Sequence, residues 1–161
     1  MTDPSNALES FQQELRHSHT KLQRGHLDPD LFLHADAVNG KPRLTYVRLD
    51  GRTVTAFVVF ALVQPIEGKH CFALGYAVPE AYRNQGRAKE VVTVAIAELQ
   101  HGLGRAGISP FYVEAIVGAD NMASRRVAEQ VISDAPVAIT DSISGLPAFR
   151  YIRKVEQTKS L

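Results

Sequence analysis

The stretch GYAVPEAYRNQGRAKEVV, from Gly75 to Val92, places a strand-like apolar run directly before a glycine and a helix-like run. The first backbone N–H groups of a helix lack partners within it, and the helix dipole makes that end positive. Together they form a site for an anion. Gly86 lets an anion approach the backbone because it has no Cβ, and Arg83 and Arg87 add positive charge. The stretch therefore predicts a phosphate site that suits a diphosphate.

The same stretch does not match the better-known nucleotide motifs. A Walker loop requires G-x-x-x-x-G-K-[ST], and the dinucleotide fingerprint requires further glycines; the stretch contains neither pattern. Taken alone, its residues also fit an ordinary turn between a strand and a helix, with the arginines in solvent. The elements around it must decide between these interpretations.

The segment before this stretch predicts two helices. The first would begin at Asp3 and Pro4, which are typical of a helix start, and end at Gly25. Its apolar face comprises Leu8, Phe11, Leu15 and Leu22. The face could pack on the protein's own sheet or dock on a partner subunit, which leaves a homodimer open. Asp28 and Pro29 repeat the start signal and predict a second, short helix.

The rest of the chain alternates strands and helices. RLTYVRL, TVTAFVVFALVQ and HCFALGYAV predict an antiparallel meander, with Asp50 and Gly51 as a hairpin turn. A helix is then expected from about Gln85 to His101, and a strand from Phe111 to Val117. A last helix would be capped by Asp120, with Ala123, Val127 and Val131 facing inward, before the closing strands VAITDS and AFRYIRK. This order predicts one mixed α/β domain.

Composition limits the function classes. The chain has 161 residues, 45% of them apolar and 22% charged, which is typical of a soluble globular protein. A net charge of +1 argues against a nucleic-acid partner. The single cysteine, Cys71, excludes an internal disulfide and favours a cytoplasmic location. The N-terminus does not resemble a signal peptide, and no apolar run approaches the ~20 residues of a membrane helix.

The order of elements and the motif V-P-E-x-Y-R-N-Q-G-R-A resemble the GNAT superfamily of N-acyltransferases, from about Arg43 to Lys154. VEAIVGADNMASRRVAEQV is most similar to the branch that contains the ribosomal-protein N-terminal acetyltransferases. The resemblance implies a mostly antiparallel sheet flanked by helices and a single domain over residues 1–161. That domain would have a helical segment at 1–40 and a core at 43–154. It also implies direct transfer of an acetyl group from acetyl-CoA to a primary amine of a small molecule or protein, with no metal.

The resemblance also implies which residues bind acetyl-CoA. The loop around Gly86 would hold the diphosphate, chiefly through backbone N–H groups. The strand before it would bind pantetheine, with Asn121 touching the pantetheine arm and Ser124 one helical turn further along. The residues implied in binding are Tyr76, Ala77, Val78, Arg83, Asn84, Gln85, Gly86, Arg87, Ala88, Lys89, Asn121 and Ser124.

Glu114 is the first candidate for the general base and would act through a water molecule; the alternative is a structural pair with an arginine such as Arg126. The resemblance implies that the backbone N–H near Val78 stabilises the oxyanion. Many relatives place a tyrosine where this chain has Ala128. Ser124, Tyr82 or water could then protonate the leaving thiolate.

Several observations weigh against other chemistry or leave it open. Cys71 lies in an apolar strand, which favours a core residue over a nucleophile. The six histidines show no metal-binding spacing. Arg125 and Arg126 fit either a contact to the 3′-phosphate of the nucleotide or a solvated helix face.

The start of the chain also departs from the family, whose fold opens with a strand and two helices. That strand is either lost or hidden in a stretch assigned here to a helix. Ala128 and this departure motivate a rival from another class, a non-catalytic acyl-CoA-binding or regulatory module. A purely structural interaction protein is the third alternative.

Overall fold

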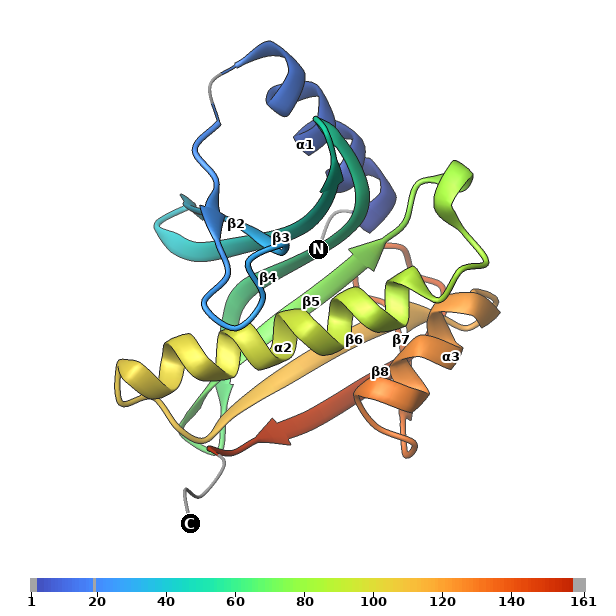
Figure 1. Cartoon of the computed structure of the whole chain (residues 1–161). Coiled ribbons are helices and arrows are strands. Elements are labelled where there is room, and N and C mark those ends of the chain that lie inside the picture. Colours follow the sequence, from blue (N-terminus) through green and yellow to red (C-terminus); the bar gives the residue numbers. More distant parts are fainter. Residues whose placement is uncertain (1–2, 19, 158–161) are drawn as a thin grey trace.

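The computed structural model describes residues 3–18 and 20–157 (Figure 1). Its elements in chain order are α1 (Pro4–His17), β1 (Gln23–Arg24), β2 (Phe32–Val38), β3 (Lys41–Asp50), β4 (Thr53–Ile66), β5 (Lys69–Ala77), η1 (Glu80–Tyr82), α2 (Arg87–Arg105), β6 (Phe111–Gly118), α3 (Met122–Val131), β7 (Val137–Thr140) and β8 (Pro147–Val155). The meander, the two later helices and the closing hairpin therefore form where the sequence predicts them.

The strands form one eight-stranded sheet in the order β1-β2-β3-β4-β5-β6-β8-β7. Neighbouring strands pair antiparallel except β5 and β6, which are parallel and connected through α2. This mixed, mostly antiparallel sheet flanked by helices confirms the fold class that the resemblance implied.

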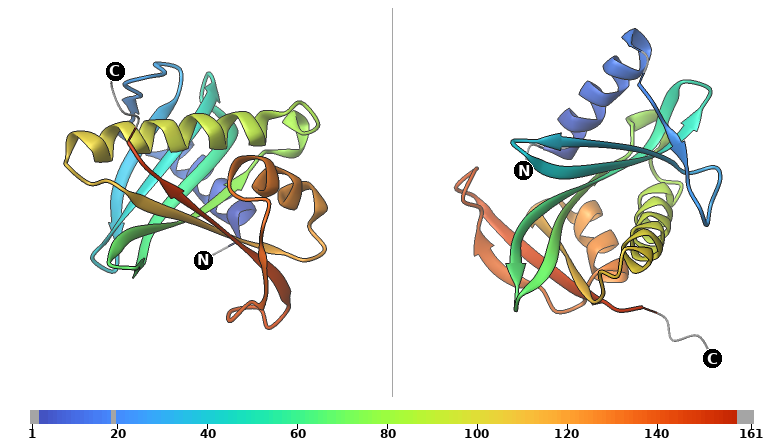
Figure 2. Two further views of the ribbon diagram at one scale, coloured as in Figure 1. Left: turned by 90° about the horizontal axis from the view of Figure 1, so that it is seen from below. Right: turned by 90° about the vertical axis from the view of Figure 1, so that its left-hand side faces the viewer.

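The helices cover both sides of the sheet, with α1 on one side and α2 and α3 on the other (Figure 2). On the α2/α3 face the core includes Phe60, Phe72 and Phe111. On the α1 face, a smaller apolar cluster is built from α1 and from β3 and β4. Its buried members are Leu8, Phe11, Leu15, Val47, Val54, Phe57 and Val59. The apolar stripe of α1 thus packs on the protein's own sheet. The stripe therefore no longer argues for a homodimer, which stays a prediction.

The region before the meander differs most from the prediction. The first helix starts at Pro4 as expected, but it ends at His17 rather than at Gly25. No helix follows Asp28; its side chain accepts a hydrogen bond from the Asp30 N–H (2.9 Å), which makes a turn. The residues expected to be helical form β2, so a strand is indeed hidden in that stretch.

β2 forms because a two-residue turn pairs it with β3. Asn39 and Gly40 connect the two strands, and both have positive φ (53° and 76°). Such turns favour Asn-Gly because their backbone twist matches that of paired strands. The stretch FLHADAV then lies in register with β3, next to the short edge strand β1.

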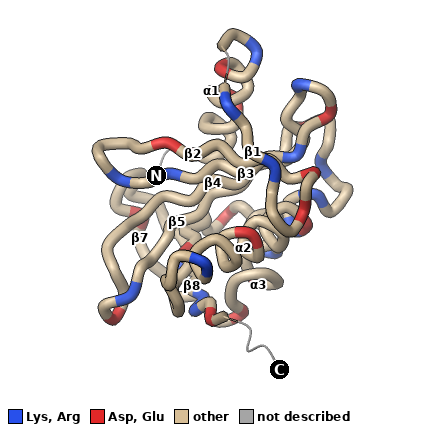
Figure 3. Tube along the Cα trace, turned by 60° about the vertical axis from the view of Figure 1, so that its left-hand side comes forward, with Lys and Arg blue, Asp and Glu red and all other residues tan. Residues whose placement is uncertain are grey.

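Charged residues are distributed over the molecule, with Lys and Arg interspersed with Asp and Glu along the chain (Figure 3). This distribution agrees with the net charge of +1. Among the described residues, no helix combines the length and the apolar character needed to cross a membrane.

Candidate functional site

The parallel strands β5 and β6 pair over only part of their length. Their register joins residues Cys71–Ala73 to Tyr112–Glu114 and goes no further. Beyond it, β5 stays paired with β4 up to Ala77, and β6 stays paired with β8 up to Gly118. The facing edges of residues 74–77 and 115–118 therefore present backbone groups that the sheet does not satisfy. A ligand can use these groups.

The start of α2 follows this separation of β5 and β6. Gly86 precedes the helix in a left-handed conformation (φ 72°), and Asn84 also has positive φ (63°). The first backbone bond of α2 runs from the Glu90 N–H to the Gly86 carbonyl (3.1 Å). The N–H groups of residues 87–89 come before that bond, and no side chain of the described residues accepts from them. A Cβ at Gly86 would meet no heavy atom within 4 Å, so the approach is open.

Side chains of the loop hold it in place. The Arg83 Nε donates to the carbonyl of Val78 (2.9 Å), which joins the loop to the end of β5. The Arg87 guanidinium lies over the ring of Tyr82, 5.1 Å from its centroid, and its Nε donates to Gln85 (3.1 Å). Tyr82 therefore packs beside the loop. Asn84, Gln85, Gly86 and Lys89 are exposed, while Ala88 is half-buried.

The other two α-helices have capped starts. The Asp3 side chain accepts a hydrogen bond from the Ser5 N–H (2.8 Å) at the start of α1. At the start of α3, the Asn121 side chain accepts from the Ser124 N–H (3.2 Å). The prediction that Asp120 caps this helix is wrong, because the helix begins one residue later than that cap requires. The cap leaves the amide NH₂ of Asn121 without an acceptor among the described residues.

Glu114 lies on β6 at the last position paired with β5. The neighbours Val113 and Ala115 belong to the core on the α2/α3 face, so Glu114 points to the α1 face. Its Oε2 accepts from the Nε (2.9 Å) and the Nη2 (2.6 Å) of Arg150. Glu114 is thus paired with an arginine, but with Arg150 on β8 rather than Arg126. Alternation along AFRYIRK could have placed Arg150 on one face, but only the register brings it to Glu114.

The position that carries tyrosine in many relatives, Ala128, is fully buried on α3. The phase of this helix was partly mispredicted: Val127 and Val131 are half-buried, but Ala123 is exposed. The hydroxyl of Tyr76 donates to the Ser124 carbonyl of α3 (2.6 Å). This contact joins β5 to α3, and the sequence had assigned only backbone contacts to Tyr76. Burial raises the pKa of Tyr76, and nearby Tyr151 raises it further, so this hydroxyl stays protonated.

Other candidates take structural positions. Cys71 is fully buried, and burial raises the pKa of its thiol to about 11, which disfavours a nucleophilic thiolate. Arg125 lies over the ring of Phe149 (4.2 Å) and donates to the Ala119 carbonyl (3.0 Å), whereas Arg126 is exposed. In the described part of the chain, no three His, Cys, Asp or Glu side chains gather as metal ligands would.

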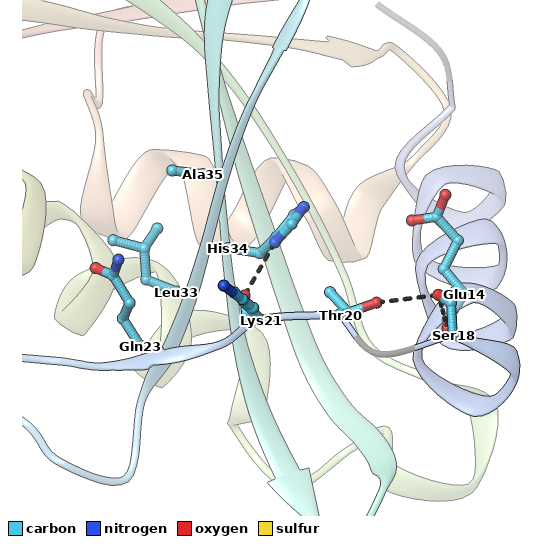
Figure 4. A pocket seen from close by; sticks show the side chains of 8 residues that line it. All are labelled: Glu14, Ser18, Thr20, Lys21, Gln23, Leu33, His34 and Ala35. Atoms are coloured by element: carbon cyan, nitrogen blue, oxygen red, sulfur yellow. Dashed lines mark hydrogen bonds between the residues drawn. The ribbon is translucent and has the colours of Figure 1, made fainter.

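A cavity of about 530 Å³ lies elsewhere, between the end of α1 and β2 (Figure 4). It is lined by Glu14, Ser18, Thr20, Lys21, Gln23, Leu33, His34 and Ala35. Within it the ring of His34 lies 3.1 Å from the Lys21 carbonyl. None of the residues that the sequence assigned to the site lines it, so the cavity is separate from the start of α2.

A family model described as the acetyltransferase (GNAT) family matches residues 8–132. Among solved structures, an acetyltransferase of the GNAT family from Streptococcus pneumoniae is 16% identical, with a TM-score of 0.54 and 96% of each chain covered. The ribosomal-protein alpha-N-acetyltransferase RimL is 16% identical, with a TM-score of 0.53 and 72% of each chain covered. The NatC complex bound to Gag peptide and CoA is 18% identical, with a TM-score of 0.51 and 71% of each chain covered.

At such low identities these likenesses show a shared fold. In other structures of RimL and its Salmonella typhimurium counterpart, the match spans 61 to 64% of the relative's chain. A search of curated proteins finds no significant match.

Proposed function

This chain belongs to the acetyltransferase (GNAT) family, and from that premise we propose that it moves an acetyl group from acetyl-CoA directly to a primary amine. One observation carries the proposal: the start of α2 has free N–H groups, directly after the point where β5 and β6 separate. The NatC and RimL structures that contain CoA support acetyl-CoA as the donor.

In this proposal the start of α2 binds the diphosphate. The N–H groups of residues Gln85 to Lys89 would donate to phosphate oxygens, and the positive end of the helix dipole would stabilise them. Arg83 and Arg87 lie beside this start and add charge. The unpaired edge of β5 near Tyr76, Ala77 and Val78 would bind the pantetheine arm, and the free NH₂ of Asn121 would donate to it from α3. Ser124 would contribute on the same face.

Acetyl-CoA supplies the acetyl group as a thioester. Glu114 would accept a proton from the acceptor ammonium, through a water molecule, so that the amine nitrogen can attack the thioester carbonyl. The N–H of Val78 would stabilise the oxyanion that forms. The C–N bond forms and the C–S bond breaks. The nitrogen gives up its second proton to water, and the thiolate takes a proton. The net reaction converts an ammonium and a thioester into an amide, a thiol and one proton.

The proton for the thiolate would come from water. Ala128 has no acidic group, and the Tyr82 ring is packed against Arg87. We expect Tyr82→Phe and Ser124→Ala to lower kcat by less than about tenfold each, since neither would be the only proton donor.

We also propose a cytoplasmic location, which the single cysteine supports because disulfides are rare in that compartment. Acetyl-CoA and an amine acceptor would be the only partners that this function requires.

Replacement of Glu114 by Gln tests the catalytic part of this function. The amide keeps the shape and can still accept from Arg150, but it cannot take a proton. We expect kcat/KM for an amine to fall about 100- to 1,000-fold, because general-base catalysis contributes on that order. The dissociation constant of acetyl-CoA should not change. A variant that keeps full activity would show that another group is the base.

A further inference from the structure

The ion pair of Glu114 and Arg150 leaves most of its hydrogen-bonding capacity unused. Both hydrogen bonds go to Oε2 of Glu114, from the Nε and the Nη2 of Arg150. Oε1 therefore takes no hydrogen bond from the described residues. A guanidinium has five N–H donors, so three of them find no acceptor in that part of the chain. The pair thus presents a carboxylate oxygen and a guanidinium edge side by side.

The pair also has a defined environment. The side chain of Glu114 is 13% exposed and that of Arg150 is 38% exposed, so the carboxylate lies deeper than the guanidinium. Arg150 is in register with Ile116 on one side and Val137 on the other, and these apolar side chains are 47% and 61% exposed. A charged pair set in exposed apolar residues suits an acceptor that combines polar groups with an apolar side chain.

The residues of β5 that lie beside this ion pair have small side chains or none. On β5, Phe72, Leu74 and Tyr76 belong to the core of the α2/α3 face, so Ala73 and Gly75 point to the α1 face. Ala73 is the register partner of Glu114. Ala73 is half-buried and Gly75 is buried, and neither places a large side chain on the α1 face where β5 and β6 separate. The proposed function brings the thioester to this point.

We propose that Glu114 and Arg150 together select acceptors whose amine has a carbonyl group on the adjacent carbon. The ammonium would bind Oε1 of Glu114 through the water molecule of the proposed mechanism, and the carbonyl oxygen, three bonds from the nitrogen, would accept from Arg150. The N-terminus of a peptide and a free amino acid share this chemistry, whereas an alkylamine would use only the carboxylate. This inference rests on the proposed function and makes Arg150 a residue that determines specificity.

Two amines with the same side chain test the proposal. Leucinamide carries the carbonyl and isoamylamine lacks it, and acetylation of both is followed by release of free CoA. We expect kcat/KM to favour leucinamide by at least about tenfold, since a hydrogen bond to a charged group contributes that much. Leucine and the dipeptide leucyl-alanine, used in parallel, distinguish a free amino acid from a peptide N-terminus.

Arg150→Gln should raise the KM for leucinamide about tenfold more than that for isoamylamine. A loss of kcat caused by removing the partner of Glu114 would be shared by both amines. Arg150→Lys keeps the positive charge but lacks the planar guanidinium and its paired donors, so its effect on the KM for leucinamide should be intermediate. Lys154→Gln is the control, because Lys154 lies on the same strand but pairs with Glu156 (3.4 Å). Equal kcat/KM of the unmodified protein for both amines, or an equal rise of KM for both in Arg150→Gln, would overturn the proposal.

A separate measurement distinguishes this inference from the proposed function. The affinities of the two amines for the CoA-saturated protein are compared by calorimetry, which needs no turnover. Tighter binding of leucinamide without any acetylation would support the recognition and contradict the transfer. Equal affinities would overturn the recognition even if both amines were acetylated.

Discussion

The helices α2 and α3 cover the same face of the sheet, but their starts differ. At α3, the Asn121 side chain accepts from the Ser124 N–H and occupies the helix end (3.2 Å). At α2, Gly86 has no side chain, and the N–H groups of residues 87–89 have no acceptor among the described residues. A helix end that is closed by its own sequence cannot also bind a phosphate through the same N–H groups.

Elsewhere the protein also satisfies converging N–H groups with its own carboxylates. Asp3 does so at α1. Glu98 on α2 is buried, and its carboxylate accepts from the N–H groups of His26 (3.0 Å), Leu27 (2.6 Å) and Asp28 (2.8 Å). Because these sites have internal acceptors, the start of α2 stands out as the one left for an external anion within the described chain.

The largest effect should come from giving α2 the kind of start that α1 has. In Gly86→Asp, the new carboxylate would cap the helix and repel phosphate. We expect the affinity for acetyl-CoA to fall at least about 100-fold, because two or more charge-assisted hydrogen bonds would be lost. The free energy of unfolding should change by less than about 1 kcal/mol, since the new cap offsets the left-handed backbone. Calorimetric titration and thermal unfolding measure both quantities.

Gly51→Asp is the matched control. Gly51 also has positive φ (62°) and open space around it, but it lies in the turn between β3 and β4. The same substitution there should leave the affinity for acetyl-CoA unchanged. If Gly86→Asp binds acetyl-CoA as well as Gly51→Asp does, the start of α2 is not the diphosphate site.

Glu98→Gln tests the site where the protein's own carboxylate, rather than a ligand, accepts from a group of backbone N–H donors. One of its two oxygens would become an NH₂ group facing a backbone N–H. We expect the free energy of unfolding to fall by about 2 kcal/mol, as is usual for a buried donor left unsatisfied. Glu90→Gln on the same helix is the control. Its side chain is 48% exposed, so its pair with Arg48 should contribute less than about 1 kcal/mol. If chemical denaturation gives the same loss in the free energy of unfolding for both variants, the buried carboxylate contributes no more than the exposed one, contrary to this account.

The smallest effect concerns Asn121, which would serve both the helix and the ligand. Asn121→Ala should lower the free energy of unfolding by about 1 kcal/mol, because it removes a cap. Asn121→Asp keeps the cap but loses the NH₂ group, so stability should hold while the affinity for acetyl-CoA falls about fivefold. Unchanged affinity in Asn121→Asp would assign this residue to the helix alone.

The start of α2 could be predicted from the sequence because local signals determine it. A strand run, Pro79, Gly86 and an apolar period of helical spacing lie within eighteen residues of one another. The cap of α1 was equally local, since Asp3 and Pro4 are adjacent. These two helix starts depend on a few neighbouring residues, so their chemistry could be predicted without knowing the fold.

Apart from the cap and the phase of α3, the errors lie where pairing between distant segments decides the structure. Asp28 and Pro29 imitate a helix start, but the turn at Asn39 and Gly40 pairs the following residues with β3 as a strand. The Asn-Gly signal was present and was outweighed by the Asp-Pro signal. The contact of Glu114 with Arg150 depends on the register of β6 and β8, and the residues of either strand do not specify that register.

The most direct test of the central claim uses the unmodified protein and two ligands. Acetyl-CoA and acetyl-pantetheine share the thioester and the pantetheine arm, but only acetyl-CoA carries the diphosphate. If the free start of α2 binds the diphosphate, calorimetry should give a dissociation constant on the order of micromolar for acetyl-CoA and one at least about 100-fold weaker for acetyl-pantetheine. Equal binding of the two ligands, or no binding of acetyl-CoA, would contradict the claim.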